Sequence, residues 1–233
     1  MKKLHNGTVK ELKEIAKNTV CLRFEPKQSM KIKPGQFVSI LCEGLTLRRP
    51  FSVADFDGHT VTVLFRQKGK GTKYLAGLKP GDEIDFTGPL GNGFDIQDKK
   101  ALVIGAGIGI APVYYLNKFL TQSHFVGAFN SEDEVPKVFE PDEKIIGGTI
   151  LDHLERLITD YKPEIIYACG PSVVLKAISK LGVPSQLALE KVMACGIGVC
   201  KGCVIKIKKG DTVQNMTICH DGPVFEGGEI VWE

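Results

Sequence analysis

Four cysteines in the last part of the chain have the spacing of a metal centre. They follow the order Cys195-x4-Cys200-x2-Cys203-x15-Cys219, with glycines at positions 196, 198 and 202. A structural zinc ion usually takes two separated pairs of ligands, whereas here three thiols come from one loop and the fourth from a distant segment. That order is typical of plant-type [2Fe–2S] proteins, and glycines let a loop wrap closely around a cluster. The spacing therefore predicts a [2Fe–2S] cluster on these four thiols, with zinc or disulfides as the alternatives.

A glycine-rich turn in the middle of the chain has the arrangement of a phosphate-binding site. Gly105, Gly107, Gly109 and Pro112 lie between the apolar stretch ALVIG and the helical pattern APVYYLNKFL. Backbone N–H groups at the start of a helix bind phosphate, so this turn favours a nucleotide ligand. It is not the G-x-G-x-x-G fingerprint, because residue 110 is isoleucine. Tight packing of strand on helix is the alternative reason for the glycines.

Two further segments bear on the nucleotide. Cys169, Gly170 and Pro171 form a turn at the end of the predicted strand EIIYA. The predicted strand FVGAFN runs directly into the acidic run 131–134, and no Lys or Arg follows before Lys137. A 2′-phosphate would meet carboxylates there instead of a guanidinium, so the acidic run favours NAD over NADP.

Two motifs in the first hundred residues could bind a second phosphate-bearing ligand. In GKGTKYL, two glycines precede Thr72 and a predicted helix, which places N–H groups where a phosphate can be received. GPLGNGF, residues 88–94, is another glycine-rich turn. Gly71 is the second of the two glycines in GKGTKYL. Apart from these two motifs, the stretch Arg49-Pro50-Phe51-Ser52 opens a predicted strand.

The elements that carry these motifs change in character along the chain. Residues 1–98 show short alternating strands separated by Pro/Gly turns, which is typical of a small antiparallel barrel. Residues 99–185 alternate apolar strands with helical patterns, as in an α/β nucleotide-binding domain with a parallel sheet. Residues 186–233 are too few to build a good hydrophobic core alone, so we expect a bound metal to stabilise this segment. The sequence predicts a multi-domain β plus α/β protein.

Composition excludes several other classes of protein. A net charge of +3 is too small to indicate a nucleic-acid or membrane-surface partner. The longest uncharged run, residues 101–117, contains three glycines and a proline and is short for a bilayer span. Seven cysteines is an odd number, and a crowded set of thiols suits a metal site in a reducing compartment. We therefore expect a cytoplasmic protein.

The barrel with Arg-x-x-Ser, followed by G-x-G-I-G-x-x-P and Cys-Gly-Pro, resembles the ferredoxin-reductase superfamily of flavoproteins. The resemblance implies FAD in the barrel, with Arg49 facing its pyrophosphate and Ser52 hydrogen-bonding near flavin N5. It also implies that Cys169 holds the nicotinamide ring near the flavin and is not a nucleophile. The other residues implied for the cofactor sites are Pro50, Phe51, Leu64, Phe65, Arg66, Gly71, Thr72, Gly105, Gly107, Gly109, Gly170 and Pro171.

The order of FAD barrel, NAD half and cysteine tail resembles a narrower family. The stretches LRRPFS, GPLGNGF, GAGIGIAP and LALEKVMACGIGVCKGCV are similar to those of the electron-transfer subunits of two-subunit, NAD-linked dihydroorotate dehydrogenases. The resemblance implies an oxidoreductase subunit of pyrimidine biosynthesis. Electrons would come from an FMN-containing catalytic subunit through [2Fe–2S] and FAD to NAD⁺, within a heterotetramer of two subunits of each kind.

Two other functions fit parts of the pattern. An FAD/[2Fe–2S] subunit of an NAD(P)–ferredoxin oxidoreductase, sulfide dehydrogenase or cytoplasmic hydrogenase would keep the cofactors and change the partner. A zinc-stapled binding module would have no redox cofactor. No Ser–His–Asp set or base for carbon chemistry is evident, so we expect no catalytic side chain of that kind.

Overall fold

The computed structural model describes residues 4–232, and its first half is a closed antiparallel barrel. The strands are hydrogen-bonded in the order β1-β2-β5-β4-β3-β6. Phe24 and Phe86 meet edge to face in its interior, where the alternating apolar residues of the strands are buried. A tight turn joins β4 to β5, in which Asp57 Oδ1 accepts the N–H groups of His59 and Thr60. The bounds are β1 Leu4–Ala16, β2 Thr19–Pro26, β3 Phe37–Ile40, β4 Arg49–Phe56, β5 Val61–Arg66, α1 Lys70–Ala76 and β6 Glu83–Leu90.

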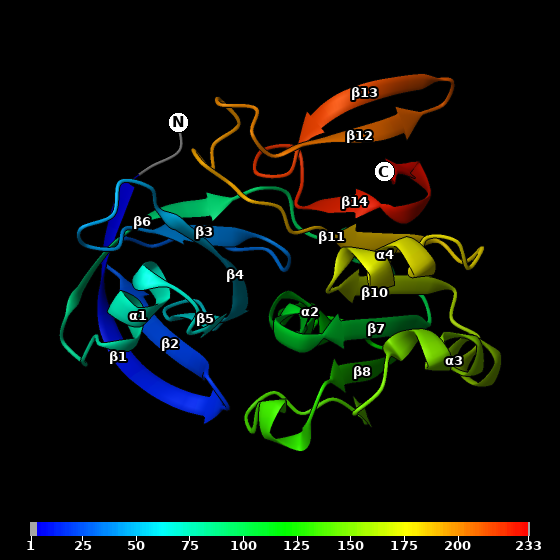
Figure 1. The fold of residues 1–233 in the computed structure, drawn as a ribbon, viewed down its shortest axis with the longest axis horizontal. Coiled ribbons are helices and arrows are strands. Elements are labelled where there is room, and N and C mark those ends of the chain that lie inside the picture. Colours follow the sequence, from blue (N-terminus) through cyan, green and yellow to red (C-terminus); the bar gives the residue numbers. More distant parts are fainter. Residues whose placement is uncertain (1–3, 233) are drawn as a thin grey trace.

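The second half is built on a six-stranded sheet in the order β14-β11-β10-β7-β8-β9. All neighbouring strands are parallel except β11 and β14. Figure 1 shows this sheet beside the barrel, with α2 between them. The bounds are β7 Ala101–Ala106, η1 Gly107–Gly109, α2 Ile110–Asn117, β8 Ser123–Phe129, η2 Glu132–Glu134, β9 Glu143–Ile146, η3 Ile150–His153, α3 Leu154–Tyr161, β10 Ile165–Cys169, α4 Ser172–Ile178 and β11 Ser185–Ala188.

The cysteine tail forms a small sheet and also enters the large one. β12, β13 and β15 make a separate three-stranded sheet, whereas β14 pairs with β11 of the α/β half. In Figure 1 the tail runs above both halves, with β12 and β13 projecting from the top. The bounds are β12 Val204–Lys209, β13 Thr212–Thr217, β14 Val224–Glu226, η4 Gly227–Glu229 and β15 Ile230–Val231.

The predicted fold class is confirmed, although some element details differ. Helix α1 begins before Gly71 and Thr72, so both lie inside its first turn and not ahead of it. The helical segment before β10 starts as the short 3₁₀ helix η3 at Ile150 and becomes α-helical only at Leu154. Pro171, in the predicted Cys-Gly-Pro turn, is the N-cap of α4. The domain boundaries 1–98, 99–185 and 186–233 stay a prediction.

Within the described part of the chain, no helix is both long and apolar enough to cross a bilayer. The longest α-helices, such as α2 and α3, have 8 residues each. Residues of the barrel, the α/β half and the tail line one common pocket, among them Phe65, Cys169 and Met193.

Candidate functional site

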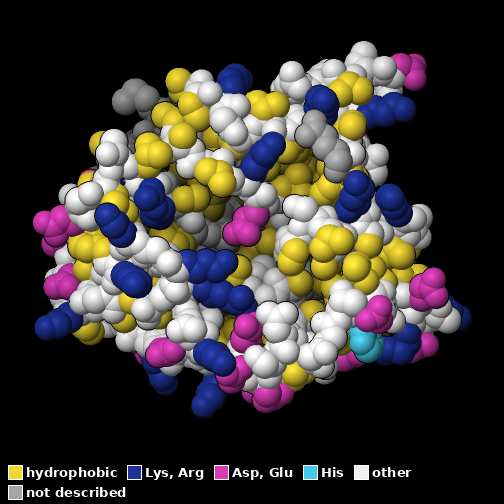
Figure 2. All heavy atoms as spheres, viewed as in Figure 1, with side chains coloured by type: hydrophobic (Ala, Val, Ile, Leu, Met, Phe, Trp, Pro, Cys, Tyr) yellow, Lys and Arg dark blue, Asp and Glu magenta, His cyan; other side chains and the backbone are white. Residues whose placement is uncertain are grey.

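A first pocket of about 520 Å³ lies between the barrel and the α/β half. Its volume falls in the range of sites for cofactors and other small molecules. Figure 2 shows the surface hollowed near the centre of the molecule, with basic and acidic side chains at the mouth. The predicted site residues that line it are Pro50, Phe51, Ser52, Leu64, Phe65, Arg66, Thr72, Gly109 and Cys169.

The barrel wall of this pocket is mostly apolar. Phe51, Leu64 and Phe65 are buried, and the rings of Phe51 and Phe65 are 5.5 Å apart. β4 and β5 are neighbours in the barrel, and Phe51 and Phe65 both belong to its interior core. Leu64, the residue before Phe65 in β5, points to the opposite face and packs with the core of the α/β half. A flat apolar wall with one half-buried hydroxyl, that of Ser52, suits a planar ring system that needs a few hydrogen bonds at one edge.

Arg49 and Gly71 do not line the pocket, although they lie against each other behind it. The Arg49 guanidinium donates to the carbonyl oxygen of Leu47 at 2.7 Å. A Cβ added at Gly71 would lie 3.1 Å from Arg49 Cγ, so a side chain there would press on this arginine. Thr72 Oγ1 accepts the N–H of Lys68 at 2.9 Å and that of Gly69 at 3.1 Å, which caps the start of α1 at the rim.

A second pocket, of about 500 Å³, adjoins the first on the α/β side. It is lined by the ends of β7, β8 and β10, as expected for a ligand site at the carboxyl edge of a parallel sheet. Gly107, Gly109, Gly170 and Pro171 line it. Arg66, Ile108, Gly109 and Glu190 line both pockets and form their common wall.

Gly105, Gly107 and Gly109 of the turn each occupy a position where glycine is favoured for a different structural reason. A Cβ at Gly105 would lie 2.6 Å from Ile110 Cα, so Gly105 permits the strand-to-helix packing that the sequence left open as an alternative. Gly107 has a φ of +57° and lies at the pocket surface. A Cβ at Gly109 would lie 2.4 Å from the carbonyl oxygen of Cys169, so this glycine lets the glycine turn touch the Cys-Gly-Pro turn.

Cys169 presents a neutral thiol to the first pocket. It is 7 % exposed, and burial strongly raises its pKa, with Glu190 acting in the same direction. A thiol protonated at neutral pH is a poor nucleophile, which agrees with the packing role implied by the resemblance. Gly170 follows it against Ala106, where a Cβ would lie 2.7 Å from the Ala106 Cβ.

The acidic run after β8 is largely occupied by contacts to the barrel. Glu134 Oε2 lies 2.9 Å from Arg66 Nη2 and also accepts a hydrogen bond from Asn130 at 3.0 Å. Asp133 pairs with Lys17 at 2.8 Å. The predicted repulsion of a 2′-phosphate by free carboxylates therefore needs revision, because two of the three carboxylates hold the two halves together.

Glu190 was missed as a candidate when the sequence was taken alone. Its only signal is that Leu189 and Glu190 follow β11, whose Ala188 is in register with Cys169 of β10. The carboxyl ends of neighbouring parallel strands lie at one edge of a sheet, so this position belongs with the other site residues. Predicting it required the register of β11, a strand that the residue pattern did not identify.

The cysteine loop has its backbone N–H groups directed at sulfur. Gly198 N lies 3.1 Å from Cys219 Sγ, and Cys200 N lies 3.4 Å from Cys195 Sγ. Gly202 N lies 3.4 Å from the Cys200 sulfur. Positive φ at residues 196 and 198 produces the reversals that allow these contacts. Such N–H groups stabilise thiolate over thiol, which is the form that binds metal.

The four sulfurs fit a two-iron centre better than a single ion. Cys203 Sγ and Cys219 Sγ are 3.3 Å apart, while Cys195 and Cys200 interact with each other. All seven cysteines have free thiols. Two pairs of thiols match a centre that takes two sulfurs on each of two irons.

The pKa values of the thiols differ across the loop. At Cys195, desolvation acts upward, but the N–H groups of Cys200 and Ile197 outweigh it and lower the pKa to about 6. At Cys219, burial and the neighbouring sulfur of Cys203 raise the pKa to about 11. Because bound iron favours thiolate, cluster binding at Cys219 would release a proton near neutral pH.

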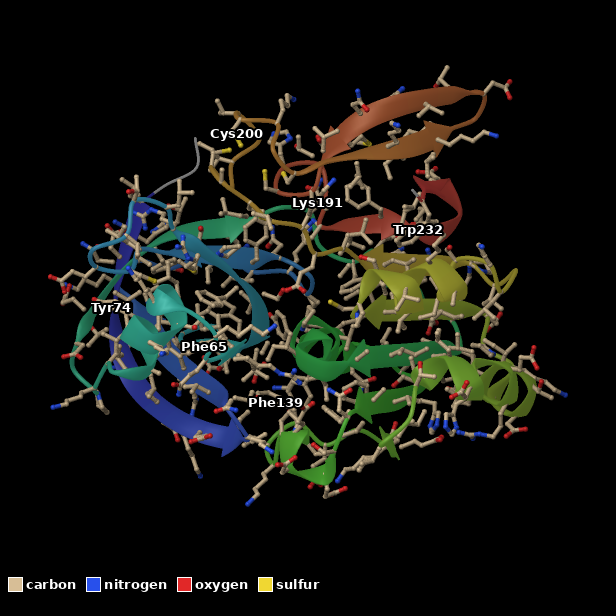
Figure 3. The ribbon with its side chains drawn as sticks, in the orientation of Figure 1. Phe65, Tyr74, Phe139, Lys191, Cys200 and Trp232 are labelled. Atoms are coloured by element: carbon tan, nitrogen blue, oxygen red, sulfur yellow. The ribbon has the colours of Figure 1, made fainter. Side chains whose placement is uncertain are left out.

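The cysteine loop is continuous with the wall of the first pocket. Lys191 and Met193 line that pocket, and Met193 is two residues before Cys195. Figure 3 shows Phe65 on the barrel side, and Lys191 between the barrel and the loop that carries Cys200. The tail is held to the barrel by Asn92, whose N–H donates to the Gly222 carbonyl oxygen at 2.6 Å. One pocket therefore has an aromatic barrel wall on one side and the approach to the thiols on another.

Comparison with protein families agrees with this division of the chain. Residues 6–94 match the oxidoreductase FAD-binding domain, which defines the chain as a flavin-dependent oxidoreductase protein. Residues 190–231 match the iron–sulfur cluster binding domain of dihydroorotate dehydrogenase B. The flavin barrel and the [2Fe–2S] tail that the sequence predicted are thus confirmed at the level of domains.

Curated relatives narrow the class to one family. The electron transfer subunit of dihydroorotate dehydrogenase B (NAD(+)) from Caldanaerobacter subterraneus subsp. tengcongensis is 37% identical, over 94% of this chain and 95% of its own. The subunit of the same name from Fusobacterium nucleatum subsp. nucleatum is 35% identical over 98% of both chains. The chain belongs to the family of dihydroorotate dehydrogenase B electron transfer subunits.

Solved structures show the same architecture in a wider group. A chain described in work on flavin-based electron bifurcation by an NADH-dependent reduced ferredoxin-NADP oxidoreductase aligns with a TM-score of 0.82 at 26% identity, covering 97% of this chain and 90% of that one. The cytochrome P450 reductase GcoB of Amycolatopsis aligns with a TM-score of 0.63 at 20% identity, which shows the fold alone. The barrel and α/β halves are thus those of ferredoxin-reductase-like flavoproteins.

Proposed function

We propose that this chain passes electrons from an FMN-containing dihydroorotate dehydrogenase catalytic subunit to NAD⁺, in pyrimidine biosynthesis. The observation that carries the proposal is the continuity of the thiol loop with the first pocket through Lys191 and Met193. The names of the curated relatives supply the oxidised substrate and the acceptor. A cytoplasmic setting is part of the proposal, because free thiols and iron–sulfur chemistry need a reducing compartment.

Three groups of residues would bind the iron–sulfur cluster, FAD and the nicotinamide. Cys195, Cys200, Cys203 and Cys219 would hold the irons, and Phe51, Leu64 and Phe65 would form the apolar wall for FAD. When bound, these groups supply one-electron transfer at the cluster and both one-electron and hydride transfer at the flavin. The chain's own contribution would be to fix distances and exclude water.

Cys169 and Ser52 would frame the place where a nicotinamide meets the flavin. Cys169 lines the first pocket while the adjoining Gly170 lines the second, so the turn reaches both. A buried, neutral thiol offers a polarizable, uncharged surface on which a ring can lie. Gly109 permits this placement, since any side chain there would collide with the Cys169 carbonyl.

The assay that tests the proposal is anaerobic reduction of NAD⁺ by dihydroorotate. The chain is coexpressed with the candidate catalytic subunit, and NADH formation is followed with each subunit alone as the control. We expect turnover only from the complex, and a mass of two subunits of each kind. A complex that contains FMN, FAD and iron yet gives no NADH from dihydroorotate would refute the proposed substrate.

A second candidate follows from the solved structure aligned over 97% of the chain. In that function, the same cofactors would serve an NAD(P)-linked ferredoxin oxidoreductase. Copurification separates the two candidates, because a partner carrying [4Fe–4S] clusters would support the second and an FMN-bearing partner the first.

A further inference from the structure

Arg66 belongs to the barrel, but its side chain lies at the border with the α/β half. It is the last residue of β5, and its side chain lines both the first and the second pocket. Within residues 4–232 it is the only Lys or Arg that lines the second pocket, whose other charged residue is Glu190. A ligand with negative charge in that pocket would therefore find a single side-chain cation.

The guanidinium of Arg66 lies over the glycine turn of the α/β half. A Cβ built on Gly107 would come within 3.5 Å of Arg66 Nη2. Gly107 has positive φ and starts the short helix η1 that leads into α2. A guanidinium facing this turn can form a fork of donors to phosphate oxygens, which is the geometry that arginine supplies and lysine does not.

The same guanidinium is held by a carboxylate from the other half of the molecule. Glu134 Oε2 lies 2.9 Å from Arg66 Nη2, and the two side chains are only 19% and 26% exposed. Asn130, which lines the second pocket, also donates to this oxygen. A partly desolvated ion pair is stronger than an exposed one, so Glu134 is a real competitor for any anion that approaches Arg66.

We propose that Arg66 binds the diphosphate of a nucleoside diphosphate ligand in the second pocket, and that Glu134 lowers the affinity by competing for the same guanidinium. This inference rests on the proposed function, in which that pocket takes NAD. It replaces the sequence-based idea that the acidic run meets the ribose directly. Glu134 acts through Arg66 and is a positioning residue that need not touch the ligand.

The inference is tested by titrating ADP-ribose into the FAD- and cluster-loaded protein and measuring heat. ADP-ribose carries the diphosphate but no nicotinamide, so the readout is independent of electron transfer. We expect Arg66→Gln to weaken binding about tenfold, because a charge-assisted contact is lost. We expect Glu134→Gln to tighten binding about threefold, because the competing charge is removed. In the double variant the Glu134 effect should disappear, since its target is gone.

A matched control is available in another ion pair between the halves. Lys118, the C-cap residue of α2, has its Nζ 2.5 Å from Asp55 Oδ2 of β4, and neither residue lines the two pockets. Asp55→Asn removes an interdomain charge pair as Glu134→Gln does, and should leave ADP-ribose affinity unchanged. Arg66→Lys keeps the positive charge but lacks the two parallel donors of the guanidinium. It replaces Arg66→Gln in the titration if that variant does not fold. FAD content is measured in every variant because Arg66 also lines the first pocket.

Several outcomes would overturn the inference. Weaker or unchanged binding in Glu134→Gln would show that Glu134 contacts the ligand or does not compete. Unchanged binding in Arg66→Gln would remove the arginine from the site. If these variants match the wild type while NADH still reduces the flavin, the inference fails and the proposed function stands. If the wild type binds no ADP-ribose, both the inference and the NAD site are refuted.

Discussion

At the scale of single residues, Cys200 and Cys169 place the same chemical group in opposite environments. Cys200 is exposed on the loop and receives an N–H from Gly202, whereas Cys169 is buried at the end of β10. A hydrogen-bond donor favours thiolate and burial favours thiol. The first environment suits a metal ligand, and the second suits a neutral packing surface.

Replacing Cys200 by serine should separate the two halves of the electron path. We expect Cys200→Ser to lose the cluster and reduction by the partner subunit, because serine is a poor ligand for iron in such a centre. NADH should still reduce FAD, since Cys200 lines neither pocket. Iron and sulfide analysis, with stopped-flow reduction at 450 nm (an approximate flavin band), measures both. A folded Cys200→Ser protein whose flavin no longer accepts electrons from NADH would contradict the proposed route.

The buried thiol of Cys169 should resist alkylation. The thiolate is the reacting form, and because burial raises the pKa of Cys169, little thiolate is present at pH 8. Iodoacetamide treatment of the FAD-loaded protein, followed by peptide mass spectrometry, should leave Cys169 unmodified, while the urea-unfolded control is labelled. The flavin reduction rate should likewise show no inflection from this thiol between about pH 6 and 9. Labelling of Cys169 in the native protein would contradict both expectations.

At the scale of elements, the contact between the glycine turn and the Cys-Gly-Pro turn connects the two pockets. The ends of β7 and β10 are paired in register, with Cys169 opposite Gly105. Gly109 allows the following turn to reach the Cys169 carbonyl, and Gly170 packs against Ala106. The nicotinamide side of the site therefore depends on backbone contacts more than on side-chain chemistry.

A methyl group at Gly109 should open this contact. Gly109→Ala places a Cβ 2.4 Å from a backbone oxygen that cannot rotate away, so the turns must separate. Overpacking of this kind costs about 1–3 kcal/mol, and we expect flavin reduction by NADH to slow at least about tenfold. Thermal unfolding and stopped-flow kinetics measure the two effects. Gly228→Ala is the control, because a Cβ there meets nothing within 4 Å. Wild-type kinetics in Gly109→Ala would show that the contact is dispensable.

At the scale of the whole molecule, the barrel and the α/β half are joined by contacts of unequal strength. Tyr115 of α2 donates to the Ile32 carbonyl oxygen at 3.1 Å and is buried. Lys17 pairs with Asp133 at the surface, where both side chains are at least 50% exposed. A buried hydrogen bond whose loss leaves an unpaired carbonyl counts for more than an exposed ion pair.

Two substitutions compare the stability that these two contacts contribute. Tyr115→Phe should lower the free energy of unfolding by about 1–2 kcal/mol, whereas Lys17→Ala should change it by less than about 1 kcal/mol. Denaturant unfolding, followed by both flavin release and circular dichroism, measures the difference and detects separate unfolding of the halves. A larger loss of unfolding free energy in Lys17→Ala than in Tyr115→Phe would mean that the exposed ion pair is the stronger contact.

Local residue patterns were enough to predict the parts of the protein and the metal centre of its tail. Strand alternation in the first hundred residues, the apolar stretch ALVIG and the spacing of Cys195, Cys200, Cys203 and Cys219 each reflect local rules that need no tertiary partner. These features predicted the barrel, the α/β half and the [2Fe–2S] domain. The family comparisons confirm the flavin-binding and iron–sulfur parts, and the parallel strands of the large sheet confirm the α/β half. The individual site residues stay a prediction.

The contacts between the parts could not be predicted from residue patterns and became visible in the folded molecule. The pairing of Arg66 with Glu134 joins residues 68 positions apart in different halves, and no local pattern encodes that contact. The place of Glu190 depends on the register of β11, and β14 joins the large sheet although it lies beyond the cysteine loop. Such contacts depend on how two separately formed surfaces pack together, which residue spacing along one chain does not specify.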